Sequence, residues 1–260
     1  MKRRSLIIAA AVSLAALQAT AQNAQNAPVH VLASNGVKAV IDAIQKQAEQ
    51  AIKRPLAIEY DTSSVVQKRI EDGAAFDVAI LTSEVIDELA KDAKIDPGTR
   101  MEIARCGIGV GVRAGAAKPD IRTADALKKT LLAAKSITYA ENGASRTYIL
   151  KMFDKFGIAD AMKAKTIPEQ GSDRSNARVA DGSAEMILTL VSEILPAPGV
   201  QLVGPLPNNV QHYVGFAMGT SKNSNNRDAA KALTKFLSSP AVAGVLKAKG
   251  MQAAPARVSR

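Results

Sequence analysis

Two short polar segments carry the residue types best suited to holding an anion. Ser34-Asn35-Gly36 and Thr62-Ser63-Ser64 each lie between a predicted strand and a predicted helix. The N–H groups in the first turn of a helix have no intrahelical acceptor, and the helix dipole adds positive potential there. Hydroxyl, amide and backbone donors at such a position favour negative charge. Serine and threonine are also ordinary N-caps, which stabilise a helix by about 1 kcal/mol without any ligand.

Other kinds of chemistry lack the residues they need. The chain has no G-x-S-x-G, no S-x-x-K with its partner motifs, no H-E-x-x-H and no P-loop, which argues against a hydrolase or a nucleotide-binding enzyme. One cysteine, Cys106, and two histidines, His30 and His212, make a poor set of metal ligands, so we expect neither a protein-ligated metal nor a cofactor. Aromatic residues are 3% of the chain, so no nucleic-acid partner is expected. A Ser-His-Asp site assembled by the fold stays open as a second class of function, an exported hydrolase.

Alternating strands and helices must position the polar segments. From residue 29 the apolar spacing predicts the order strand, helix, strand, helix, strand, which implies a parallel sheet with right-handed crossovers. A second alternating set follows, and two crossing strands would join the two α/β lobes. The predicted strands are 29–33, 56–60, 77–81, 103–112, 136–140, 185–191 and 213–218. The predicted helices are about 37–48, 64–72, 85–90, 123–134, 145–156, 173–181 and 227–249, the last broken near Pro240.

This pattern resembles that of type II periplasmic substrate-binding proteins of ABC importers, and within that class it is similar to the molybdate-binding proteins. The likeness rests on Ala33-Ser34 closing the first strand, on Thr62-Ser63-Ser64 opening a helix, and on Phe236-Leu237-Ser238-Ser239-Pro240 near the end of the chain. The resemblance implies that Ser34 and Ser63, with Asn35 and Ser64 beside them, donate hydrogen bonds to a small oxyanion.

The second half of the chain departs from the molybdate-binding pattern. The resemblance places ligand contacts at Ser145 and Ser172, but Arg146 and Arg174 follow these serines, and Leu190 stands where that family has a tyrosine. Arginine pairs through two hydrogen bonds with carboxylate or phosphate, a contact that a caged tetrahedral oxyanion does not require. Either arginine is equally explained as a solvated surface charge. If they face the cleft, the ligand is an organic carboxylate or a phosphorylated solute rather than molybdate.

The N-terminus has the features of a secretory signal peptide. Lys2, Arg3 and Arg4 precede an apolar run over residues 6–17, and Ala19-Thr20-Ala21 forms an A-x-A cleavage signature. We predict cleavage after Ala21, which removes three of the ten formal net positive charges. The apolar run is too short for a membrane span, so a signal peptide over 1–21 and a periplasmic location are expected.

These observations predict an α/β, two-lobed type II periplasmic binding protein fold, each lobe a mixed, mostly parallel sheet flanked by helices. We expect lobe 1 to comprise residues 29–104 plus 211–260, and lobe 2 to comprise residues 105–210. The predicted function is capture of a small molybdate- or tungstate-like oxyanion between the lobes, without catalysis, by a monomer that delivers it to the permease of an ABC importer. A role in sensing or scavenging without a permease is the weakest alternative.

Overall fold

The computed structural model describes residues 27–254. The predicted signal peptide over 1–21 lies outside these residues. The strands are β1 (Val29–Ser34), β2 (Leu56–Asp61), β3 (Val78–Thr82), β4 (Met101–Arg113), β5 (Ile137–Ala140), β6 (Thr166–Glu169), β7 (Met186–Leu190), β8 (Val200–Pro205), β9 (Tyr213–Thr220) and β10 (Met251–Ala253). The helices are α2 (Asn35–Ile52), α3 (Ser63–Glu71), α4 (Ser83–Lys91), η1 (Pro97–Thr99), α5 (Ala124–Ala133), α6 (Arg146–Phe156), α7 (Ala159–Lys165), α8 (Ser172–Asp181), α9 (Val191–Ile194), α10 (Arg227–Leu237) and α11 (Pro240–Ala248).

The long strand β4 connects two groups of strands. Its first half, over 101–107, pairs antiparallel with β9 and β10, and its second half, over 108–113, pairs antiparallel with β7 and β8. On one side β1 lies between β2 and β3, parallel to both, and on the other β5 lies between β6 and β7, also parallel to both. The strand order along the sheet is β2-β1-β3-β9-β4-β7-β5-β6.

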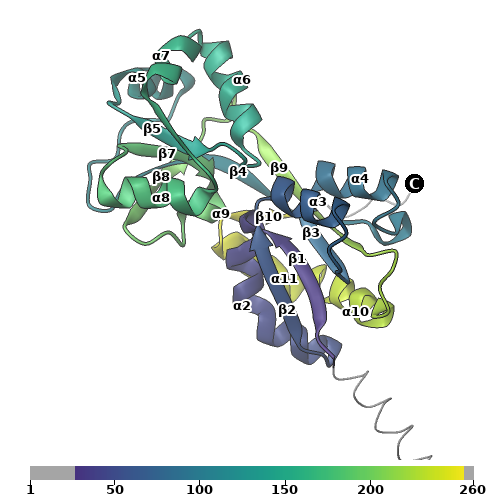
Figure 1. Cartoon of the computed structure of the whole chain (residues 1–260). Coiled ribbons are helices and arrows are strands. Elements are labelled where there is room, and N and C mark those ends of the chain that lie inside the picture. Colours follow the sequence, from purple (N-terminus) through teal and green to yellow (C-terminus); the bar gives the residue numbers. More distant parts are fainter. Residues whose placement is uncertain (1–26, 255–260) are drawn as a thin grey trace, which may run out of the picture.

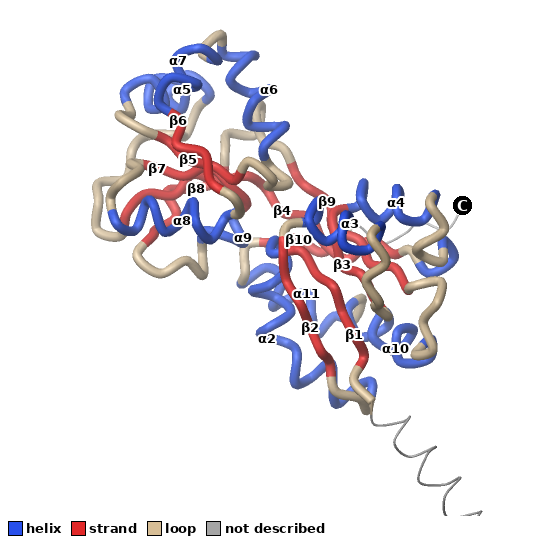
Figure 2. Tube along the Cα trace, in the orientation of Figure 1, coloured by secondary structure: helices blue, strands red, loops and turns tan. Residues whose placement is uncertain are grey.

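The helices divide between the two ends of this sheet (Figure 1). Helices α2, α3, α4, α10 and α11 surround β1, β2 and β3, whereas α5, α6, α7 and α8 surround β5 and β7, and β4 and β9 run between the two groups. The tube drawing shows the strands of each group meeting along β4 (Figure 2). This is the α/β arrangement of two groups with crossing strands that the sequence predicts. The lobe limits at residues 104 and 210 stay a prediction.

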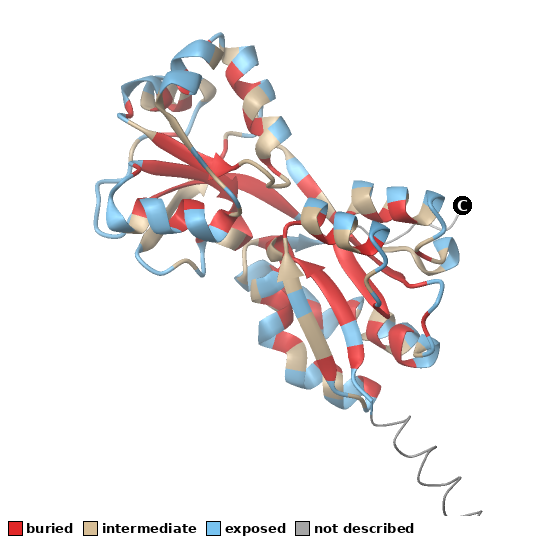
Figure 3. Ribbon diagram, in the orientation of Figure 1, coloured by how far each residue is buried: buried red, intermediate tan, exposed pale blue. Residues whose placement is uncertain are grey.

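Apolar side chains on the strands form the core. All residues of β3 and β7 are buried, as is usual for strands covered on both faces. The buried side chains of α2 repeat at helical spacing, with Val37, Ile41 and Ile44 against the sheet, while its other face is exposed. Figure 3 shows buried strands inside and alternating buried and exposed helix faces outside. No helix among residues 27–254 is long and apolar enough to cross a membrane.

Several short elements were not predicted from the sequence. Strand β8 (Val200–Pro205) lies partly in a segment whose glycine and prolines read as a connector, and Val191–Ile194 forms helix α9 where a strand was expected to end. Strand β6 contains Pro168, which is tolerated because β6 is at the end of the sheet. Each of these elements depends on pairing or packing with distant residues, so local spacing carries little signal for it.

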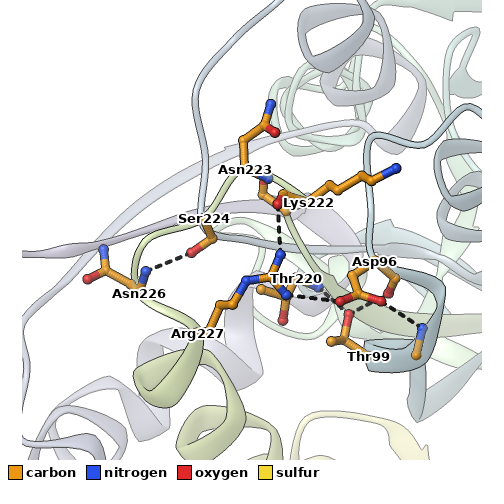
Figure 4. Close-up of polar contacts among 10 residues, drawn as sticks. Asp96, Thr99, Thr220, Lys222, Asn223, Ser224, Asn226 and Arg227 are labelled. Carbon is orange, nitrogen blue, oxygen red and sulfur yellow. Dashed lines mark hydrogen bonds and ion pairs between the residues drawn. The ribbon is translucent and has the colours of Figure 1, made fainter.

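A polar network fixes the connection between β9 and α10 (Figure 4). The Arg227 guanidinium contacts Asp96 Oδ2 at 2.9 Å and donates to the Lys222 carbonyl oxygen at 2.7 Å. Thr99 Oγ1 donates to the Asp96 carbonyl oxygen at 2.6 Å and accepts from the Thr220 N–H at 2.9 Å. The network therefore ties the short helix η1 to the segment that enters α10.

Candidate functional site

The first two predicted tips are neighbours at one edge of the sheet. Ser34 is the last residue of β1 and its register partner in the parallel strand β2 is Asp61, directly before Thr62. Helix α2 begins at Asn35 and helix α3 at Ser63, so both helix N-termini lie at this edge. In α/β proteins, ligands bind beyond the carboxyl ends of parallel strands. Ser34 and Ser63 therefore lie at the edge of the sheet where α/β proteins bind their ligands, as the sequence analysis expects.

Both of these serines are buried, and each oxygen accepts a backbone hydrogen bond. Ser34 Oγ accepts from the Gly36 N–H at 3.3 Å, and Ser63 Oγ accepts from the Thr82 N–H at 3.1 Å. Their residues are 3% and 5% exposed, respectively. The first contact is an N-cap, whereas the second joins the α3 tip to the end of β3. Because each oxygen is an acceptor in these bonds, each hydroxyl hydrogen stays available for donation.

The second group of tips is assembled in the same way. Ser145 directly precedes α6, and Ser172 is the first residue of α8; both are buried. Between them, Asn142 Oδ1 accepts a hydrogen bond from the Gly171 N–H at 2.9 Å, which fixes the β5–α6 connection to the start of α8. Ser145 and Ser172 therefore lie at adjoining helix N-termini, as Ser34 and Ser63 do.

Two hydrogen bonds join the first group of tips to the rest of the site. Ser64 Oγ, from α3, donates to the Asn142 carbonyl oxygen at 3.2 Å. Ser192 Oγ, from α9, donates to the Gly36 carbonyl oxygen at 2.8 Å. The first contact joins the start of α3 to the connection that enters α6, and the second joins the start of α2 to α9. We call this region the junction.

A cavity of about 750 Å³ opens beside the junction. Its buried polar side chains are those of Ser172, Asn176 and Ser192, and Asn35 and Glu193 are partly buried. Exposed charged residues of α2 and α8 form its rim, together with a proline-rich turn after α9. The remaining lining residues are Lys38, Ala39, Asp42, Asp173, Ala177, Ala180, Asp181, Pro196, Ala197 and Pro198.

The two arginines are placed differently from the serines. Arg146 Nε contacts Glu141 Oε2 at 2.9 Å, and the two side chains are 38% and 32% exposed. Arg174 is exposed, and the described residues include no hydrogen-bonding or ion-pair partner for it. Neither residue is among those that line the cavity. A ligand-binding role for Arg146 and Arg174 therefore stays a prediction.

Sequence reasoning missed Glu193, which lies at the start of α9. Its carboxylate accepts a hydrogen bond from Thr189 Oγ1, and Ser172 contributes a second side-chain hydrogen bond. Burial raises the pKa of the Glu193 carboxyl above its ordinary value, while these two hydrogen bonds act in the opposite direction. The surrounding sequence, Thr189 to Ile194, reads as the end of an apolar strand, so only the fold reveals the position of this carboxyl.

Cys106 and His212 differ in their surroundings. Cys106 is buried, and burial raises the pKa of its thiol to about 11, as is typical of a cysteine that packs in a core. The His212 ring stacks on the Tyr148 ring with 3.3 Å between centroids. Burial lowers the pKa of His212. Within residues 27–254, no group of three or more His, Cys, Asp or Glu side chains could hold a metal ion.

The sequence comparison identifies the class of protein. Residues 29–252 match the model of the bacterial extracellular solute-binding proteins, and the chain belongs to this family. An aconitate isomerase from Pseudomonas sp. is 28% identical over 235 residues, which cover 87% of this chain and 88% of that protein.

Solved structures confirm the fold predicted from the sequence. The periplasmic molybdate-binding protein of Azotobacter vinelandii is similar with a TM-score of 0.70 and 16% identity, over 86% of this chain and 98% of that one. The sulfate-binding protein SubI from Mycobacterium tuberculosis H37Rv is similar with a TM-score of 0.69 and 20% identity, over 89% of this chain and 88% of that one. The fold is therefore that of the type II periplasmic binding proteins.

Proposed function

We propose that this protein binds a small organic polycarboxylate at the junction. The observation that carries the proposal is the convergence of four helix N-termini, each with a buried serine. The starts of two of these helices, Asn35 of α2 and Ser172 of α8, line a cavity of about 750 Å³. Helix N-termini favour anions because their first N–H groups lack intrahelical acceptors. A cavity of roughly 300–1,000 Å³ is typical for organic ligands. A tetrahedral oxyanion, with one central atom and its oxygens, would fill only a small part of this space.

The charges at the helix starts support an anionic ligand. The first turns of α2, α3 and α6 contain no acidic residue, and α8 has only Asp173, which is exposed. A bound carboxylate at these three helix starts would therefore meet little repulsion from the helices that hold it. Arg174 lies on the first turn of α8 and would add positive charge near the same region, whereas Arg146, on the first turn of α6, is paired with Glu141.

The relative named aconitate isomerase supports the same ligand class. Aconitate is an unsaturated tricarboxylate, and the similarity covers most of both chains. A tricarboxylate offers three anionic groups, which matches a site built from several separate helix N-termini better than a single compact charge does.

Capture of an inorganic oxyanion is the second candidate. Ser34 and Ser63 favour it, because both are buried neutral donors of the kind that the resemblance to molybdate binders predicts. Thermal shift separates the candidates, since a ligand at 100 times its Kd stabilises the folded state by about 2.7 kcal/mol. We expect trans-aconitate, cis-aconitate, citrate or tricarballylate to raise Tm, and molybdate, tungstate, sulfate and phosphate to leave it unchanged. A shift with molybdate or tungstate alone would support the second candidate instead.

The biological setting follows from the family and from the predicted signal peptide. We infer that cleavage after Ala21 yields a periplasmic monomer that closes on its ligand and delivers it to the permease of an ABC importer. Mass spectrometry of the periplasmic form should give an N-terminus at Gln22. An intact Met1 on the exported protein would contradict this part of the proposal.

A further inference from the structure

The Tyr148 and His212 rings stack between the two ends of the sheet. Their centroids are 3.3 Å apart, and their planes are inclined by 12°. Tyr148 lies on the first turn of α6, which packs with β5, β6 and β7, the second strand group (Figure 1). His212 directly precedes β9, which pairs with β3 of the first strand group, β1, β2 and β3. The stack therefore connects a helix of the second group to the strand that enters the first.

The chain crosses between the two strand groups next to this stack. Strand β4 pairs with β9 up to Gly107 and with β7 from Ile108 onward. The Gln211 side chain spans this change of partner, because its Oε1 accepts from the Ile108 N–H and its Nε2 donates to the Ile108 carbonyl oxygen, both at 2.9 Å. Hinges between moving parts are typically a few residues at the ends of elements. His212 therefore lies where one strand group can turn relative to the other.

Two further hydrogen bonds hold α6 near the crossing. Lys155 Nζ donates to the Asn209 carbonyl oxygen at 3.2 Å, in the segment that leads to β9. Ser64 Oγ, from the first group, donates to the Asn142 carbonyl oxygen shortly before α6. Because α6 begins directly after Ser145, these bonds and the stack together position one of the helix starts of the junction.

The charged groups that act on the His212 ring come from two helices. Glu84 lies on the first turn of α4, and Lys151 lies on α6 with its Nζ 5.8 Å from the centroid of the Tyr148 ring. Burial and the charge of Lys151 lower the pKa of His212, whereas Glu84 acts in the opposite direction. The stacked arrangement therefore favours the neutral imidazole over the imidazolium.

We propose that the Tyr148–His212 stack is a latch that holds the two strand groups together, and that protonation of His212 releases it. His212 is thus a positioning residue, since it contacts α6 rather than the ligand. The proposal rests on the proposed function in one respect, because release of the latch weakens binding only if the two groups close on the ligand. It does not depend on which anion is bound.

The direction of the pH effect follows from the two arrangements. A His212 ring that leaves the stack is hydrated and regains its ordinary pKa of 6.5, which is higher than its pKa in the stack. Protons therefore bind the released arrangement more tightly, and acid shifts the population toward it. The latch is fully present well above pH 6.5 and is lost as pH falls from there through the lower pKa of the stacked ring.

Small-angle X-ray scattering of the ligand-free protein tests the latch without any ligand. The radius of gyration of wild type should increase between about pH 8 and about pH 5, the range in which histidine titrates. His212→Phe keeps an aromatic ring for the stack and cannot take up a proton, so its radius should stay the same. His30→Gln is the matched control, since His30 is the other histidine of the chain and is exposed on β1. It should respond as wild type does.

Calorimetry with trans-aconitate measures the effect of the latch on binding. Between the same two pH values, wild type should lose about threefold or more in affinity relative to His212→Phe. Comparing the two proteins at each pH cancels the ionisation of the ligand itself. At the higher pH their affinities should agree within about twofold.

The outcomes separate the latch from the proposed function. A wild-type radius that does not respond to pH, or the same pH dependence in wild type and His212→Phe, would overturn the latch. A pH-dependent radius without binding of trans-aconitate would support the latch and count against the proposed ligand class. If His212→Phe does not fold, Tyr148→Leu replaces it, because it removes the stacking partner. Its radius at the higher pH should match that of acidified wild type, and a radius equal to wild type at that pH would overturn the proposal.

Discussion

The Ser64 hydroxyl donates a hydrogen bond to the carbonyl oxygen of Asn142, 78 positions further along the chain, at 3.2 Å. The contact joins the N-terminus of α3 to the connection between β5 and α6. Asn142 also accepts from the Gly171 N–H through its side chain, so one residue links the starts of three helices. This link holds the start of α3 next to the starts of α6 and α8, where the proposed anion would bind.

Removing that link should weaken ligand binding. Ser64→Ala eliminates one hydrogen bond between the two groups of tips, and a net contribution of about 0.5–1.5 kcal/mol corresponds to an affinity loss of roughly 2- to 12-fold. Calorimetry with the ligand found by thermal shift measures it. Ser238→Ala, which removes an exposed hydroxyl at the end of α10, is the control and should leave affinity unchanged. Equal affinity in Ser64→Ala would show that the contact plays no part in closure.

Alanine variants of Ser34, Ser63, Arg146 and Arg174 should show whether the ligand is a polycarboxylate or an inorganic oxyanion. Ser34→Ala and Ser63→Ala should each weaken binding by about 1–3 kcal/mol, because each removes a buried donor from a desolvated charge. For a polycarboxylate, loss of whichever of Arg146 or Arg174 contacts it should cost about 2–5 kcal/mol. For a caged inorganic oxyanion, both arginine variants should change little except the salt dependence. Calorimetry on the four variants decides, and weak effects in all four would place the site elsewhere.

The close packing at Gly36 should make this position intolerant of a side chain. A Cβ at Gly36 would lie 2.5 Å from Phe216 Cζ and 3.1 Å from Leu190 Cδ1. Gly36→Ala should therefore destabilise the fold by about 1–3 kcal/mol. Gly244→Ala in α11 is the matched control, since its Cβ would meet nothing within 4 Å, and alanine there should stabilise by about 0.4–1 kcal/mol. Urea denaturation of both variants measures the difference, and equal stability would contradict the packing described.

Asp77 is a buried carboxylate that should stabilise the fold, and the size of this stabilisation should depend on pH. It accepts from Ser224 Oγ at 2.7 Å, from Asn226 Nδ2 at 2.9 Å and from the His30 N–H at 2.9 Å. Burial by itself would raise the pKa of Asp77, but these three hydrogen bonds outweigh it and hold the pKa below its usual value of 3.8. Asp77→Ala leaves three donors unpaired and should cost about 2–4 kcal/mol in the free energy of unfolding.

The lowered pKa of Asp77 sets the direction of the pH effect. Above pH 3.8 the carboxylate is ionised in both the folded and the unfolded chain, so its contribution is fully present. As pH falls from there through the lower pKa of the folded state, the unfolded chain binds the proton first and the contribution is lost. Denaturant titrations between pH 6 and about 2 should show a smaller acid-induced loss in Asp77→Ala than in wild type. An identical loss in both proteins would contradict this account.

The sequence predicts the fold well where a pattern is local. Val37, Ile41 and Ile44 show the spacing of a helix that packs on a sheet, and Ser34 marks its start, so α2 and the position of its cap were predictable. Leu202 and Met251 belong to strands that form by pairing with β4, which is distant in sequence, and their neighbourhoods gave no such signal.

The candidate site was predictable to the extent that it consists of helix starts. Ser34, Ser63, Ser145 and Ser172 each precede or begin a helix, and the structure gathers them at the junction. Glu193 could not be found in this way, because its place at the site depends on the contact with Ser172 and on the cavity beside it. The residues that meet across the junction are set by tertiary packing, which local spacing does not encode.

A calorimetric titration of the mature protein with trans-aconitate and, separately, with molybdate tests whether the junction binds a polycarboxylate. We expect saturable binding of one trans-aconitate per chain, weakened in Ser34→Ala, and no heat of binding with molybdate. Saturable binding of molybdate without any response to trans-aconitate, citrate or tricarballylate would contradict this expectation.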